Sequence, residues 1–168
     1  LLSRAVSAAD GAEEWFAGGI VVQRDRERRQ VLGVSSSDPI SEGCAVQMAI
    51  GAATLFGTGA AVAATGVGGP EPVGGRSPGT IVIGWVVDGR WGSSTLELPG
   101  TTREISLRTV RTALTALSRA MTDADDSHGG QVALLHLVAE AQLEAAHRQG
   151  DRVQRGRRVG LVHGHRGS

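Results

Sequence analysis

The sequence predicts an α/β fold in which a mixed β-sheet is flanked by helices. Three observations predict it. Residues 79–87 form a β-branched, apolar run, and after Asp88-Gly89 a second strand-like run follows at 90–98. Residues 107–121 carry apolar side chains at alternating spacings of three and four, which is typical of a core-facing helix. Strand-like and helix-like segments alternate along the chain, as in sheets covered by helices.

The composition limits the classes of function. The 168 residues are 40% hydrophobic and 20% charged, which suits one compact domain with a tail. Their formal net charge of zero argues against nucleic acid as a chain-wide partner. No apolar run is long enough to cross a bilayer, and Cys44 is the only cysteine, so we expect a cytoplasmic protein without a membrane partner.

The first 34 residues predict a helix, a strand and a second helix. Residues 1–8 resemble a helix already under way, because no start signal precedes them, and we expect an upstream segment to be missing. Residues 18–23 are apolar on both faces and predict a buried strand. The mixed-sign run 24–29 predicts a short helix with a solvated face.

A second helix is predicted after Ser41, which is a favourable N-cap. Gly57 is a favourable stop, and residues 60–64 predict a narrow, fully apolar central strand. We expect one face of this helix to contact the sheet: Val46, Ala49, Ile50, Ala53 and Phe56.

The longest helix is expected to open at residues 100–102, with a core-facing stripe. Its members are Leu107, Val110, Leu114, Leu117 and Met121. The composition changes after residue 121. Residues 122–130 predict an acidic, glycine-containing linker, 131–148 an extra helix, and 149–168 a basic, disordered tail.

The loop after the predicted central strand suggests a binding site. Three glycines, Gly66, Gly68 and Gly69, let backbone N–H groups approach an anion closely. Thr65 supplies a hydroxyl, Pro70 stiffens the exit, and Arg76 adds positive charge. The alternative is a connection that uses glycine only for its turns. The loop matches neither a Walker A motif nor the dinucleotide fingerprint.

Four motifs resemble one known family. Residues 15–22 with 32–34, residues 40–52 ("I-S-E-x-x-A"), residues 65–70 ("T-G-V-G-G-P") and residues 78–82 ("P-G-T-I-V") occur in the order and at the spacing of the CinA C-terminal domain, the nicotinamide-nucleotide amidase family. The resemblance covers residues 1–121.

The resemblance implies a three-layer sandwich, a homodimer and hydrolysis of nicotinamide mononucleotide to nicotinic acid mononucleotide and ammonia. It also implies a nucleotide-type site at Thr65, Gly66, Val67, Gly68, Gly69, Pro70 and Arg76, with no cofactor and no metal. The resemblance further implies that an N-terminal strand and the segment with the serine nucleophile precede Leu1. Gln23 and Arg28 stand where the resemblance implies a tyrosine and a lysine that activate the serine.

These replacements bear on the chemistry. The chain has no lysine and no tyrosine, and glutamine has no titratable oxygen. Arginine stays protonated and is no general base. Two hypotheses follow: an amidase-family member with catalytic residues missing or replaced, or a non-catalytic nucleotide-binding or interaction module of the same fold. A third idea is that the basic tail contacts nucleic acid, although no aromatic residue interleaves with its arginines.

Overall fold

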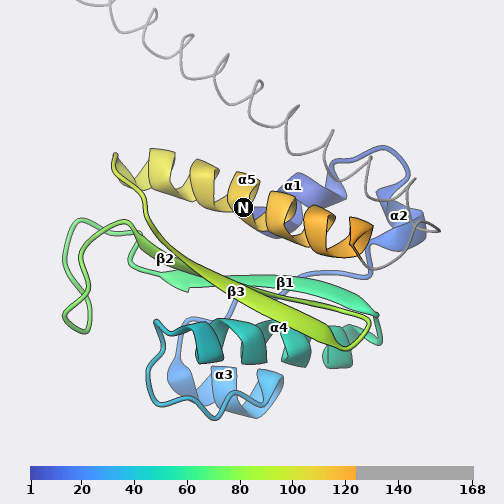
Figure 1. The fold of residues 1–168 in the computed structure, drawn as a ribbon, viewed down its shortest axis with the longest axis horizontal. Coiled ribbons are helices and arrows are strands. Elements are labelled where there is room, and N and C mark those ends of the chain that lie inside the picture. The colour runs from blue at the N-terminus through green and yellow to red at the C-terminus, as the bar shows by residue number, and fades with distance from the viewer. Residues whose placement is uncertain (124–168) are drawn as a thin grey trace, which may run out of the picture.

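The computed structural model describes residues 1–123, and these form a β-sheet between two layers of helices (Figure 1). Helix α4 covers one face of the sheet, with α3 packed on its outer side, and α5 covers the other face beside α1. This arrangement confirms the predicted α/β class. The elements in chain order are α1 (Leu2–Ser7), α2 (Ala12–Trp15), α3 (Asp25–Leu32), α4 (Glu42–Phe56), β1 (Ala60–Gly66), β2 (Thr80–Val87), β3 (Arg90–Glu97) and α5 (Thr102–Thr122).

The sheet has the order β1-β2-β3, and both strand pairs are antiparallel. The hairpin between β2 and β3 confirms the turn predicted at Asp88-Gly89. Both turn residues have positive φ, 48° and 80°, as a two-residue hairpin turn that matches the strand twist requires.

The prediction of a central strand at residues 60–64 is wrong within the described part of the chain. β2 pairs on both sides and is almost completely buried, whereas β1 lies at an edge of the sheet. Apolar residues alone did not identify the centre, because α4 and α5 cover both faces of β1 as well as of β2, so both strands are apolar on both faces.

The strand predicted at residues 18–23 is also wrong, because this segment is extended but unpaired. Within residues 1–123, no backbone hydrogen bond joins it to another segment. Ile20 and Val22 pack toward Leu32 and Cys44, whereas the side chain of Val21 is 77% exposed. A strand requires a partner, and local sequence does not reveal whether one is present.

Helix α4 begins and ends where the sequence predicts. The Ser41 hydroxyl accepts a hydrogen bond from the Cys44 N–H at 3.2 Å, and Gly57 ends the helix with φ at 65°. The predicted face is partly wrong. Ala45 and Ala49 are fully buried against the sheet, but Ile50 is 42% exposed, because the helix approaches the sheet through its smallest side chains.

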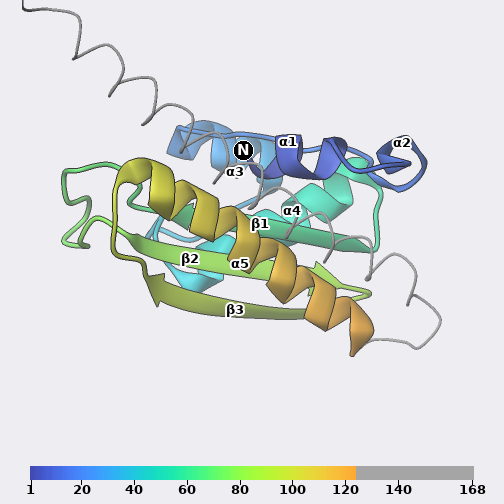
Figure 2. The same cartoon turned by 90° about the horizontal axis from the view of Figure 1, so that it is seen from above.

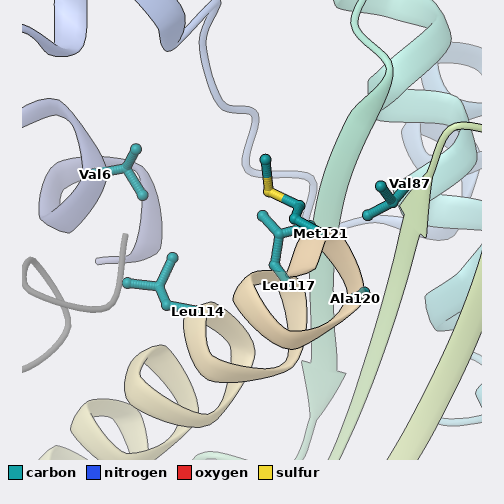
Figure 3. Packing of buried hydrophobic residues seen from close by; sticks show 6 residues of the cluster. All are labelled: Val6, Val87, Leu114, Leu117, Ala120 and Met121. Carbon is teal, nitrogen blue, oxygen red and sulfur yellow. The ribbon is translucent and has the colours of Figure 1, made fainter. Parts of the chain in front are cut away.

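Helix α5 confirms the predicted core stripe at its centre and C-terminal end. Leu114, Leu117 and Met121 are buried, and Figure 3 shows Val6 of α1 facing Leu114. Thr101 and Glu104 form a capping box at its start, and their hydrogen bonds hold the pKa of the Glu104 carboxyl below its usual value.

The remaining predictions concern the first 32 residues and the segment after α5. Helix α1 confirms the helix predicted over residues 1–8, and α3 confirms the short helix in the mixed-sign run. The sequence did not predict the four-residue α2. Apart from Thr122, which ends α5, and Asp123, the linker, helix and tail predicted over 122–168 lie outside the described residues.

One glycine sets the distance between the sheet and α4. Gly84 lies in β2 on the face toward α4, and a Cβ built there would clash with the backbone of Ala45 and Val46. The clash is with backbone atoms, so no side-chain rotation relieves it.

We expect Gly84→Ala to lower the free energy of unfolding by about 3 kcal/mol, because α4 must move away from β2. Gly43→Ala is the matched control: its Cβ meets open space within α4, and it should raise stability by about 0.5–1 kcal/mol. Urea unfolding of both variants measures the difference. Equal effects of the two substitutions would show that the helix does not depend on this close approach.

Candidate functional site

The predicted glycine loop is anchored through Val67. This residue is 2% exposed, its N–H donates to the Thr80 carbonyl at 2.8 Å, and its carbonyl accepts from the Gly79 N–H at 2.8 Å. Its side chain packs with Ile40 and Val82 in the core. Val67 therefore holds the loop on β2, and its side chain is not a ligand contact.

The glycines of the loop differ in their roles. A Cβ on Gly66, which has φ of 152°, would clash with the Thr80 carbonyl, so this glycine allows close approach to β2. A Cβ on Gly68 or Gly69 would meet open space. Their N–H groups make no hydrogen bond to residues 1–123, and Pro70 beyond them is exposed. Gly68 and Gly69 are thus the free backbone donors of the loop.

Thr65 and Arg28 meet at one backbone carbonyl. The Thr65 Oγ1–H donates to the Pro39 carbonyl at 2.7 Å, and Arg28 Nη1 donates to the same oxygen at 3.5 Å. The end of β1, helix α3 and the connection before α4 are joined at this point. The Thr65 hydroxyl thus donates its proton within the protein, and its oxygen keeps the capacity to accept a hydrogen bond.

Arg76 forms an ion pair that sequence reasoning missed. Its Nη2 lies 2.9 Å from Asp38 Oδ2, and both side chains are partly exposed. Asp38 Oδ1 also accepts from the Ile40 N–H at 2.9 Å. This backbone hydrogen bond, followed by the Arg76 guanidinium, holds the pKa of the Asp38 carboxyl below its ordinary 3.8. The Asp38 carboxylate therefore partly compensates the positive charge of Arg76, which the sequence analysis assigned to phosphate binding.

The mixed-sign run was expected to be solvated, and Arg28 is an exception. Its side chain is 12% exposed, with Nη2 3.5 Å from Asp25 and Nη1 3.8 Å from Cys44 Sγ. Its Nε is buried and has no hydrogen-bond partner in the part of the chain that the structure describes. Gln23 is exposed, and no hydrogen bond from residues 1–123 orients its side chain.

The serines near this site take part in hydrogen bonds that hold the backbone before α4. Ser41 caps α4, and its hydroxyl lies 3.1 Å from that of Ser36. Gln47 Oε1 accepts from the N–H groups of Ser35 and Ser36 and fixes the loop before the helix. The five histidines, at 128–165, lie outside the described residues.

Two absences hold for residues 1–123. No three acidic, histidine or cysteine side chains in this range gather to hold a metal ion. No helix there has both the length and the apolar character that a bilayer span needs.

A cavity lies away from the predicted loop. It measures about 550 Å³ and is lined by the extended segment Phe16–Val22, by β1 and by apolar side chains of α4 and α5. Neither residues 65–70 nor Arg76 line it. The sequence did not predict this cavity. The only related observation was the apolar pattern of residues 18–23, which we interpreted as a strand. The nucleotide site at the loop stays a prediction.

Comparison with known proteins covers the same residues. A model of the CinA C-terminal domain matches residues 1–121. A CinA-like protein of Mycobacterium marinum is 33% identical over 130 residues, which are 73% of this chain and 31% of that protein. The curated relatives are longer, and the chain spans between 23% and 31% of the first of them.

Solved structures share the fold. The competence damage-inducible protein A from Klebsiella pneumoniae matches with a TM-score of 0.69 and 28% identity, over 72% of this chain and 79% of that one. A competence-damaged protein superfamily member from Escherichia coli matches with a TM-score of 0.65 and 28% identity, over 68% and 70%.

The Asp38–Arg76 pair makes stability depend on pH. Because the pKa of Asp38 is lowered on folding, its contribution is complete above about 3.8 and is lost as the pH falls through the lower folded value. We expect Asp38→Asn to destabilise the protein at pH 6, with a gap to the wild type that closes toward pH 2–3 and shrinks in 1 M salt. Urea unfolding across this range measures the gap. A difference in unfolding free energy that is constant with pH would mean that the ion pair does not stabilise the folded protein.

Proposed function

The chain belongs to the CinA C-terminal domain family, and from this premise we propose that it is a non-catalytic nucleotide-binding module of that fold. The observation that carries the proposal is the state of Arg28. Its guanidinium is nearly buried and is held by the Pro39 carbonyl and Asp25, at the position where the family resemblance implies a catalytic lysine.

The chemistry of these residues argues against amide hydrolysis. A serine hydroxyl is a weak nucleophile near neutral pH and needs a base to take its proton. A guanidinium stays protonated and only donates hydrogen bonds, so Arg28 is no such base. Gln23, at the implied tyrosine position, has no titratable oxygen to relay a proton. The two positions therefore supply hydrogen bonds without acid–base chemistry.

The glycine loop supports binding of a phosphate. The N–H groups of Gly68 and Gly69 have no hydrogen-bond partner among residues 1–123, and open space adjoins both residues in this part of the chain. Free backbone N–H groups and an arginine side chain are the donors that bind phosphate oxygens. Arg76, the nearest cation in the sequence, is 39% exposed and is held by Asp38. A phosphate that binds there competes with this carboxylate.

We expect calorimetry to detect nicotinamide mononucleotide binding to the 168-residue chain. Gly68→Val should abolish it by blocking the free N–H groups, without a cost to the fold, because the new side chain enters open space. Arg76→Ala should weaken it about tenfold, as loss of a charge-assisted hydrogen bond does. Asp38→Asn should tighten it by releasing Arg76. Arg111→Ala on the exposed side of α5 is the matched control and should have no effect.

The competing function is hydrolysis of the carboxamide, in which water adds to the amide carbon and ammonia leaves. An ammonia-release assay with nicotinamide mononucleotide, on the 168-residue chain and on any longer natural protein that contains it, separates the two. Turnover that is lost in Arg28→Ala would overturn the non-catalytic proposal. Binding without turnover would support it. Unchanged binding in Gly68→Val would remove the site from the glycine loop.

A further inference from the structure

An apolar groove lies beside the C-terminal half of α4, and we call it the α4 groove. It measures about 350 Å³ and is lined by the last turns of α4, the residues after that helix and the turn between β2 and β3. Ile50 of α4 and Val86 of β2 both line it, and Ile50 is 42% exposed. Trp91 of β3 pairs with Val86, so the two side chains lie on the same face of the sheet, and Trp91 is 64% exposed. Within residues 1–123, two large apolar side chains beside this groove are therefore left uncovered.

The described part of the chain ends next to the α4 groove. Gly89 of the hairpin turn lines the groove, and Arg90 follows it. The Arg90 guanidinium donates to the Ala120 carbonyl at 2.8 Å and to the Asp123 carbonyl at 3.3 Å. Figure 2 shows the C-terminal end of α5 beside the turn between β2 and β3. The chain therefore continues into residue 124 at the edge of the groove.

Residues 131–148 lie outside the described part, and their sequence predicts a helix with one apolar side. Apolar residues recur there at spacings of three and four, with polar residues on the other side of the predicted helix. A single helix of this length is marginal in water, so it depends on burying its apolar side against another surface. The apolar stripe consists of Leu134, Val138, Ala141 and Ala145, and the polar side carries His136, Glu140 and His147.

The connection is long enough to bring this segment to the groove. Residues 124–130 reach up to roughly 23 Å when extended. Layers of secondary structure pack about 10 Å apart, so the path from α5 around the hairpin turn to the α4 side of the sheet is about 20 Å. A segment on so short a tether has an effective concentration in the millimolar range and can cover a small groove. A second copy needs a larger surface, about 800 Å² on each partner.

We propose that residues 131–148 of the same chain pack on the α4 groove and cover Ile50 and Trp91 with their apolar stripe. The CinA family model matches residues 1–121, so this contact adds to the family's fold. The groove lies at the Val87 end of β2, whereas the glycine loop lies at the Thr80 end. The proposal therefore does not depend on the nucleotide site.

The test measures how fast engineered cysteines react with a maleimide in the 168-residue chain. Ile50 and Val31 are both 42% exposed, so Ile50→Cys and Val31→Cys should react at similar rates if nothing covers the groove. If residues 131–148 cover it, Ile50→Cys should react about tenfold or more slowly than Val31→Cys. Thr54→Cys is a second probe that lines the groove and leaves Ile50 in place. The native Cys44 is 1% exposed and adds little background.

Two matched substitutions identify the segment that covers the groove. Val138→Asp puts a charge on the apolar stripe and should restore fast labelling of Ile50→Cys and Thr54→Cys. His136→Asp, on the polar side of the same predicted helix, should leave labelling slow. Fast labelling of both groove cysteines in the otherwise unchanged chain would overturn the proposal. So would slow labelling that Val138→Asp does not relieve, or labelling that slows further as the protein concentration rises, because that dependence indicates a second copy.

Discussion

The close approach of α4 to β2 is the constraint on which the rest of the structure depends. It exists because Gly84 has no side chain and because the facing turn of the helix contains Ala45 and Ala49. The position of α4 in turn fixes the Ser41 cap and the connection before it. That connection carries the Pro39 carbonyl and Asp38, which hold Thr65, Arg28 and Arg76. The geometry of the candidate site is thus a consequence of helix–sheet packing.

The elements that local sequence predicted correctly are those with local stop and start signals. Ser41 and Gly57 bound α4, Asp88-Gly89 turns the hairpin, and a threonine opens α5. Each of these signals acts through hydrogen bonds or dihedral angles within a few residues. Strand pairing has no such local signal. Residues 18–23 were therefore predicted as a paired strand and residues 60–64 as the centre of the sheet. The apolar character of both segments was identified correctly.

The candidate site was predictable only in part, for the same reason. Glycine spacing located the free N–H groups of Gly68 and Gly69, and family resemblance placed Arg28 near the loop. The partners of Thr65 and Arg76 were not predictable, because Pro39 and Asp38 lie 26 and 38 residues away in the sequence. The burial of Arg28 was missed because its partner, the Pro39 carbonyl, lies 11 residues further along the chain and the charged run gives no local signal for it.

The arginine at position 28 has a consequence for how the site responds to its surroundings. A lysine that acts as a base must exchange a proton with solvent, so its environment changes charge in every cycle. An arginine keeps its positive charge at every physiological pH, and the lowered pKa of the Asp38 carboxyl keeps that group ionised over the same range. A phosphate that binds there therefore meets two charges that do not change with pH in this range, whereas its own second ionisation lies near pH 6.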